Sequence, residues 1–298
     1  MPLTVKPLHP VFAAEVTGID LSQPLTDAAV AEIAAAMDLY AVCVFPRQPL
    51  TDEQQIAFSS RFGPLETTRK ANRPGFKPRL DLRVSNISNL DENDRIMARD
   101  DWRRAGDLGN RMWHTDSSFK RTPAKYSLLS ARTIPASGTE TQFADLRAAY
   151  DALSEKKKQE IEDLVAMHSL IYSRTKIGFT DYLPEEREKE APVPQVLVRT
   201  HPGSGRKTLY LASHARDIIG LPLPEACILL YDLIDHATQP RFVFTHRWSV
   251  GDLVIWDNRC TMHRAREYDM TQVRDLHRTT VADIAPTVEQ AGLQSRVA

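Results

Sequence analysis

The sequence predicts a mainly β fold with helical insertions, and two features lead to that class. Short apolar runs rich in β-branched and aromatic residues recur along the 298-residue chain, as in "AVCVF" (41–45) and "DLVIWDN" (252–258). Helical patterns gather in the first half of the chain and in segments between these runs. We therefore expect an all-β core with helices attached to it.

The N-terminal part alternates short strands with helices. Residues 3–21 are expected to form strands interrupted by prolines. The Ala-rich segment 25–40 has a helical period, and Thr26 is its expected N-cap. A second helix is expected to begin after Thr51 and to end at Gly63.

Residues 66–108 are polar, weakly periodic and rich in Arg, Asp and Asn. Within them, only 84–88 has the pattern of a strand. Surface segments of this length are often lids or binding loops, so a lid-like excursion is expected here.

The second half returns to β patterns. Residues 148–164 predict one long helix, and 223–238 predict an amphipathic helix. Residues 195–212 contain two apolar runs around a Gly/Pro turn, which predicts a hairpin. The remaining strands are expected at 126–134, 141–146, 241–248, 252–258 and 275–283.

Composition excludes several classes of protein. A net charge of −1 creates no strong field for nucleic acid or an anionic membrane. The three widely spaced cysteines, Cys43, Cys227 and Cys260, are a poor disulfide framework and favour a reducing compartment. No secretory signal pattern and no apolar run near the roughly 20 residues of a membrane span are found. We expect a soluble cytoplasmic protein without nucleic-acid or membrane partners.

The segment "RMWHTDSSF" (111–119) places a histidine and an aspartate one residue apart. In an extended strand, residues i and i+2 point to the same side. His114 and Asp116 would then direct an imidazole and a carboxylate at a common point, which is two thirds of a metal site.

Among the nine histidines, His263 stands out as a candidate third ligand because two arginines come soon after it in the chain. Arg274 and Arg278 lie 11 and 15 residues later, and their even spacing would keep them on one side of a strand. Two inward-facing guanidinium groups each need an anion, and carboxylates of small molecules are the natural choice.

Two histidines and one carboxylate leave three positions open on a metal, which suits non-haem Fe(II) that must also bind a cosubstrate and O₂. The order HxD, then a distant His, then Arg resembles the Fe(II)/2-oxoglutarate-dependent dioxygenases. Matching stretches such as "PLHPVFAAEVTGIDL", "WHTDSSF" and "HRWSVGDLVIWDNRCTMHR" extend the resemblance to the taurine dioxygenase family. Within it, the chain most resembles the 2,4-dichlorophenoxyacetate (2,4-D) dioxygenases.

The resemblance implies one dioxygenase domain over 1–298 with a double-stranded β-helix (jelly-roll) core. It also implies Fe(II), 2-oxoglutarate and O₂ as cofactor and cosubstrates. The implied site residues are His114, Asp116 and His263 for the metal, Thr141 and Arg274 for 2-oxoglutarate, and Arg278, Asn110 and Lys70 for the substrate. His201 and His214 flank the hairpin; a structural role is favoured for both, with a place in the pocket wall as the alternative.

The implied reaction hydroxylates the carbon next to the ether oxygen of an aryloxyacetate such as 2,4-D. It gives a phenol and glyoxylate, with succinate and CO₂. Relatives of this branch form dimers or larger homo-oligomers. Three alternatives remain open: a taurine, alkylsulfonate or sulfate-ester dioxygenase of the same family, a zinc hydrolase with the same three ligands, and a non-catalytic jelly-roll binding module.

Overall fold

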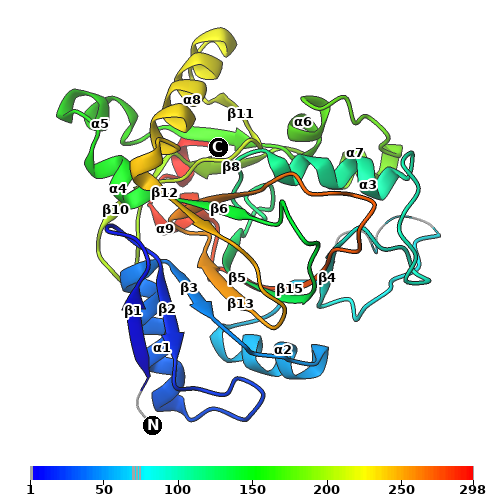
Figure 1. Ribbon diagram of the computed structural model, residues 1–298. Helices are drawn as coiled ribbons and strands as arrows, with labels where there is room; N and C mark the ends of the chain where they lie inside the picture. The colour runs from blue at the N-terminus through cyan, green and yellow to red at the C-terminus, as the bar shows by residue number, and fades with distance from the viewer. Residues whose placement is uncertain (1–2, 69–70, 72, 74, 298) are drawn as a thin grey trace.

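The computed structural model describes residues 3–68, 71, 73 and 75–297 (Figure 1). The strands are β1 (Thr4–Pro7), β2 (Ala14–Thr17), β3 (Val42–Phe45), β4 (Ser85–Ser88), β5 (Ala124–Thr133), β6 (Thr141–Asp145), β7 (Val165–His168), β8 (Val193–Val196), β9 (Val198–Thr200), β10 (Lys207–Leu209), β11 (Ala215–Ile218), β12 (Val243–His246), β13 (Leu253–Asp257), β14 (Thr261–Ala265) and β15 (Asp275–Ala282). The α-helices are α1 (Asp27–Tyr40), α2 (Asp52–Ser59), α3 (Trp102–Asp107), α4 (Leu146–Asp151), α5 (Glu155–Ile161), α6 (Leu170–Thr175), α7 (Pro184–Lys189), α8 (Leu223–Ala237) and α9 (Thr287–Gln290).

Two sheets form the centre of the fold. The larger has the order β1-β2-β3-β13-β5-β15-β4, and the smaller has the order β12-β6-β14. Figure 1 shows β6 and β12 above β5, β13 and β15 in the view. Outside this pair, β11-β7-β8 form a third sheet and β9-β10 form the predicted hairpin.

Strand β13 shows how the layers are built, because all five of its residues are buried. Leu253 and Ile255 belong to an apolar cluster that includes side chains of α1 and α2. Val254 and Trp256 belong to a cluster on the opposite face, where the Phe143 ring of β6 lies 5.5 Å from the Trp256 ring. One strand therefore serves both faces of the large sheet through its period of two.

The predicted helix starts are confirmed. The Thr26 side chain accepts a hydrogen bond from the Ala29 amide at the start of α1. Thr51 and Gln54 form a reciprocal capping box at the start of α2. These caps begin the two helices that cover the outer face of the large sheet.

Three local expectations are wrong. Residues 148–164 form two helices, α4 and α5, because the Ser154 side chain caps a new helix by accepting from the Lys157 amide. The motif around 114–116 is an isolated bridge followed by a turn, and not a strand. Within 66–108 the chain also forms the short helix α3, which the weak periodicity did not indicate.

The excursion is joined to the core at the start of β15. Arg79 donates two hydrogen bonds to Asp275, at 2.7 and 2.8 Å, and one to Asp94 at 2.6 Å. On the other side of Asp275, His277 Nε2 lies 3.3 Å from Oδ1, and its Nδ1 lies 2.6 Å from Asp52 Oδ1 on α2. One network of charges therefore joins the excursion, β15 and α2.

We expect this network to make stability depend on pH. Burial opposes the charge on His277, but hydrogen bonds to Asp275 and Asp52 outweigh it and raise the pKa above 6.5. A raised pKa adds stability that is fully present below pH 6.5 and is lost as pH rises through the folded-state value. In urea titrations, the difference between wild type and His277→Gln should be largest in mild acid and should shrink in alkali. A difference that grows with pH would contradict the assignment.

Within the described ranges, no helix is both long and apolar enough to cross a membrane.

Candidate active site

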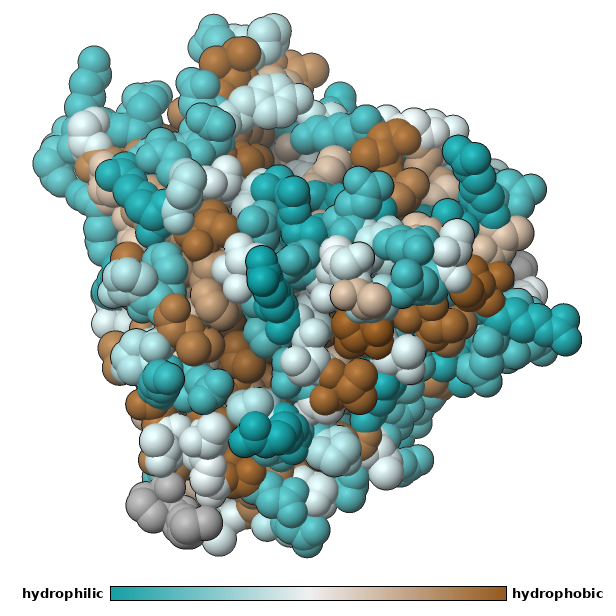
Figure 2. All heavy atoms as spheres, in the orientation of Figure 1, coloured by the Kyte–Doolittle hydropathy of each residue, from teal (hydrophilic) through white to brown (hydrophobic). Residues whose placement is uncertain are grey.

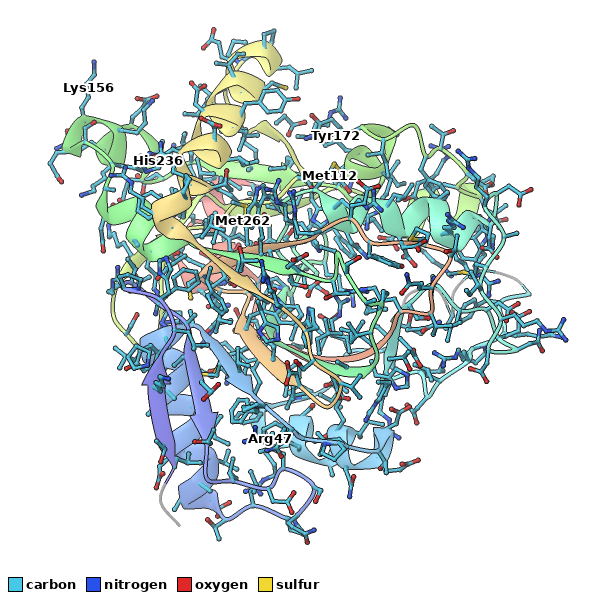
Figure 3. The ribbon with its side chains drawn as sticks, in the orientation of Figure 1. Arg47, Met112, Lys156, Tyr172, His236 and Met262 are labelled. Carbon is cyan, nitrogen blue, oxygen red and sulfur yellow. The ribbon has the colours of Figure 1, made fainter. Side chains whose placement is uncertain are left out.

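Two distant segments meet through backbone hydrogen bonds and bring the candidate ligands together. The His114 amide donates to the His263 carbonyl at 3.0 Å, and the His263 amide donates back at 2.8 Å. Figure 3 labels Met112 and Met262, which lie in these two segments. His263 lies in β14, a strand that the sequence did not predict.

The side chains of His114, Asp116 and His263 converge, with one ligand atom of each within 4.8 Å of the others. The His114 Nε2 to Asp116 Oδ1 distance is 3.9 Å, and the His263 Nε2 to Asp116 Oδ2 distance is 3.7 Å. All three residues are buried. Three donor atoms at these separations can surround one metal ion and leave its other side open.

The protonation states suit a cation. His114 Nδ1 lies 2.8 Å from the Met112 carbonyl, which as its hydrogen-bond acceptor fixes the proton there and leaves Nε2 free to bind. Burial lowers the pKa of His114 to about 4 and holds the pKa of His263 well below its usual value. Burial opposes ionisation of Asp116, but the charge of Arg278 and a hydrogen bond from Ser127 Oγ at 2.7 Å lower its pKa. Two neutral imidazoles and one carboxylate therefore fit a divalent ion.

A second cluster among the described residues, His201, Asp257 and Cys260, does not offer the same chemistry. The Asp257 carboxylate already accepts from His201 at 2.9 Å and from Arg259 at 2.6 Å. Burial raises the pKa of the Cys260 thiol, so a thiolate ligand is disfavoured. We therefore expect this cluster to be structural, and a structural role for His201 stays a prediction.

Arg274 lies in a cavity that it shares with His114, His263, Thr141 and Arg278. It is 5% exposed, and its Nη1 donates to the Ile87 carbonyl at 3.2 Å. No carboxylate of the described residues lies within ion-pair distance of its guanidinium group. A buried cation without an anion is unfavourable, so this cavity suits an anionic ligand.

Thr141 lies in the same cavity and is oriented by Trp248, whose Nε1 donates to its Oγ1 at 2.9 Å. With that oxygen accepting from the indole, the hydroxyl hydrogen can be donated to a ligand. The cavity thus combines two candidate metal ligands, His114 and His263, with a guanidinium group and a hydroxyl group. That combination fits a small dicarboxylate.

A larger cavity opens beside Asp116. Arg278 lines both cavities, and its Nη1 donates to Asp116 Oδ1 at 2.5 Å. The walls of the larger cavity combine cationic side chains with apolar ones. Its lining includes Arg79, Arg174 and Arg278 and the apolar residues Phe76, Leu80, Val84, Phe119 and Leu170.

Asn110 lines this larger cavity and the Arg274 cavity, and its Oδ1 accepts from Arg174 Nη2 at 3.2 Å. The neighbouring Gly109 is required for that contact, because a Cβ atom there would lie 2.2 Å from Arg174 Nη1. Asn110 is thus placed at the boundary between the two cavities. Lys70 lies outside the described residues.

We expect Gly109→Ala to displace Arg174 and weaken substrate binding. The Arg174 guanidinium group ends a flexible side chain, so it would move instead of straining the fold. Loss of one such donor from the substrate cavity, about 1 kcal/mol, should lower kcat/KM for the substrate by several-fold. Gly106→Ala is the matched control, because its Cβ would meet Phe179 only at 3.8 Å, an ordinary contact. Equal kcat/KM values for the two variants would show that Arg174 does not depend on Gly109.

Two residues of the larger cavity, His214 and Arg174, were not among the site residues chosen from the sequence. His214, expected to be structural, lines the larger cavity, and its buried Nε2 has no hydrogen-bond partner among the described residues. Arg174, on α6, carried no motif that could single it out. Both residues lie in segments that only tertiary packing brings next to residues 114–116.

The sandwich of sheets, the three converging ligands and the cationic cavity beside them are typical of non-haem Fe(II) enzymes. Residues 4–280 match the family described as "Taurine catabolism dioxygenase TauD, TfdA family", and the chain belongs to this family. It is therefore an Fe(II)/2-oxoglutarate-dependent dioxygenase with a jelly-roll core, as predicted.

Three similar proteins have informative names. The chain is 46% identical over 287 residues to the alpha-ketoglutarate-dependent 2,4-dichlorophenoxyacetate dioxygenase of Cupriavidus pinatubonensis, covering 96% of this chain and 99% of the relative. It is 42% identical to the (S)-phenoxypropionate/alpha-ketoglutarate-dioxygenase of Sphingobium herbicidovorans, over 93% and 94% of the two chains. The crystal structure of AAD-2 with Mn(II) and N-oxalylglycine has a TM-score of 0.89 and 49% identity, covering 97% of this chain and 99% of that one.

Proposed function

We propose that this dioxygenase hydroxylates the carbon next to the ether oxygen of an aryloxyacetate such as 2,4-D. The resulting hemiacetal would break down to a phenol and glyoxylate, while 2-oxoglutarate would be converted to succinate and CO₂. The observation that carries the proposal is the larger cavity, which combines guanidinium groups with apolar walls beside the candidate metal ligands. Similarity to 2,4-D and phenoxypropionate dioxygenases supports the same substrate class.

We propose a separate role for each group of site residues. His114, Asp116 and His263 hold Fe(II), which with bound 2-oxoglutarate and O₂ supplies the oxidation of a substrate C–H bond. Arg274 and Thr141 bind the distal carboxylate of 2-oxoglutarate in the smaller cavity.

Arg278 binds the substrate carboxylate in the larger cavity, and Asn110 shapes the boundary. In this arrangement, the carboxylate anchors the substrate so that its methylene group points to the metal side of the cavity. Positioning of that bond, and not a further acid or base, would determine the product.

A turnover panel tests the proposed substrate. The purified protein with Fe(II) and 2-oxoglutarate is given 2,4-D, (S)-2-phenoxypropionate, taurine and an alkyl sulfate, first without air and then with it. We expect oxygen-dependent succinate with phenol release from the aryloxyalkanoates. Succinate coupled to sulfite or sulfate release instead would favour the sulfonate or sulfate-ester alternative. Hydrolysis without O₂ would favour the zinc alternative.

We also propose that residues 1–298 act as one domain, that the protein is cytoplasmic, and that it forms a homo-oligomer through α8. Cys43, Cys227 and Cys260 are free, which suits a reducing compartment.

The proposed interface rests on three large apolar side chains of α8 that are exposed: Leu223, Ile228 and Tyr231. Figure 2 shows apolar surface over this helix at the top of the view. Light scattering of wild type and Ile228→Lys would test the interface.

A further inference from the structure

The Ser118 side chain lies between two buried histidines, His168 and His214, which belong to or directly adjoin strands of the sheet β11-β7-β8. Its Oγ is 3.0 Å from His214 Nδ1 and 3.0 Å from His168 Nδ1. His168 ends β7, and His214 directly precedes β11, its antiparallel partner, with the Ser169 amide donating to the His214 carbonyl at 2.9 Å. Ser118 itself is fixed by Gln195, whose Nε2 donates to the Ser118 carbonyl at 2.8 Å.

The hydroxyl group couples the protonation of the two rings. Both rings are buried, and no carboxylate of the described residues lies within ion-pair distance of either, so both rings are neutral and carry one proton each. Ser118 has one hydrogen to donate. If Ser118 donates to His214, it must accept from His168. If it donates to His168, it must accept from His214. A third arrangement, in which both rings donate, would leave the hydroxyl hydrogen without a partner in a buried site.

The far nitrogens of the two rings select the direction. The Nε2 atoms of His168 and His214 are both buried without a hydrogen-bond partner among the described residues. His168 is fully buried and stacks against the Tyr210 ring at 5.9 Å, whereas His214 lines the larger cavity. A buried N–H without a partner is rarer in proteins than an unpaired acceptor. The proton of His168 therefore belongs on Nδ1, where Ser118 can accept it.

We propose that His168 and Ser118 are positioning residues that fix the tautomer of His214, so that His214 presents an Nε2–H donor to the substrate cavity. The chain of hydrogen bonds runs from His168 Nδ1–H to Ser118 Oγ and from Ser118 O–H to His214 Nδ1. The cavity then offers a directed neutral donor in addition to its guanidinium groups. This assignment of the donor to an oxygen atom of an aryloxyacetate rests on the proposed function.

The tautomers can be measured without any substrate. The protein is labelled with ¹⁵N-histidine, loaded with Zn(II) as a diamagnetic ion and bound to N-oxalylglycine, and the ring nitrogens are recorded by NMR. We expect His214 to be protonated at Nε2 and His168 at Nδ1, with His168→Asn used to assign the signals. A His214 ring protonated at Nδ1 would overturn the proposal, and so would a His168 ring protonated at Nε2.

Kinetics test the consequence with two variants of nearly equal size. The amide of His168→Asn can still donate to Ser118, whereas His168→Leu cannot. Loss of one neutral hydrogen bond predicts a rise of about five-fold to ten-fold in KM for 2,4-D in the Leu variant, with KM for 2-oxoglutarate unchanged. The Asn variant should stay within about two-fold of wild type.

Equal KM values for the Asn and Leu variants would show that the ring acts through packing alone and would overturn the relay. Ser118→Ala provides a second break in the chain and should raise KM for 2,4-D in the same way. If wild type does not turn over 2,4-D, the proposed function fails, but the NMR result still decides the tautomers. The two failures are therefore distinguishable.

Discussion

Replacing His114 by alanine is expected to abolish iron binding and turnover together. The variant would leave Asp116 and His263 as two of three candidate ligands, and Asp116 would keep its 2.5 Å contact with Arg278. A carboxylate paired with a guanidinium group and one imidazole cannot replace a three-ligand set that must leave positions open for the cosubstrate and O₂. We expect less than about one tenth of an equivalent of iron and no succinate above background.

The fold should survive this substitution, which makes the result interpretable. The bridge between residues 114 and 263 uses backbone atoms only, and the neighbouring Thr115 hydroxyl still donates to the Leu211 carbonyl. The melting temperature of the metal-free variant should therefore lie close to that of metal-free wild type. His9→Ala, near the N-terminal surface, is the control and should retain full iron and activity. An alanine variant that holds one equivalent of iron and forms succinate would remove His114 from the ligand set.

The parts of the fold that the sequence predicted correctly are those with a local cause. Thr26 and Thr51 cap helices because their side chains accept from amides three residues later. Gly63, with φ of 142°, ends the short 3-10 turn that continues the second helix. β13 was visible because its first four residues form the apolar run expected of a strand that is buried on both faces. Each of these signals lies within a few residues of the element that it predicts.

The structure brings the three predicted ligands together, but not through the extended strand that the sequence suggested. His114 forms a single bridge with His263, and the chain turns at Asp116, with Ser117 at φ of 54°, so the two residues do not share a strand. Strand β14 was missed because its sequence, "TMHRA", is short and polar at its end, and its pairing with β6 is a long-range contact. The local sequence pattern gave the spacing of His114 and Asp116, but it could not show that this segment pairs with β14.

The substrate cavity was the least predictable part. Arg174 and His214 come from α6 and from the turn before β11, and no motif joins them to residues 114–116. Their place depends on the packing of the β11-β7-β8 sheet beside the jelly roll. A histidine taken alone is most often structural, so only the place of His214 in the cavity lining, together with its unpaired Nε2 atom, could reveal a different role.

Replacing Arg274 by alanine is expected to raise KM for 2-oxoglutarate far more than KM for the aryloxyacetate. Loss of one partner from a buried charge pair costs about 2–5 kcal/mol, which corresponds to roughly 30-fold to several thousand-fold. Arg278→Ala should do the reverse, with the larger effect on the aryloxyacetate. Arg274→Lys keeps the charge but loses the bidentate geometry and should fall between wild type and alanine. Equal effects of both alanine variants on both ligands would mean that the two arginines are wrongly assigned.

The melting temperature of an Arg274 variant should show whether this arginine stabilises the fold or binds the ligand. Burial lowers the pKa of this arginine, which means that its charge is held at a cost in the free protein. Arg274→Met removes that charge but leaves the Ile87 carbonyl without its donor, a loss of about 1 kcal/mol. Replacing a buried charge by an apolar side chain can stabilise by about 1–4 kcal/mol, so the ligand-free variant should melt at or above the wild-type temperature.

Addition of Fe(II) and 2-oxoglutarate under nitrogen should reverse that order. Ligand binding stabilises the folded state in proportion to the logarithm of ligand concentration over Kd. Wild type should therefore gain several degrees in melting temperature, while Arg274→Met should gain only the part that is due to the metal. A Met variant that is less stable than wild type without ligands would show that Arg274 holds the fold together. A Met variant that gains as much as wild type would show that the cosubstrate binds elsewhere.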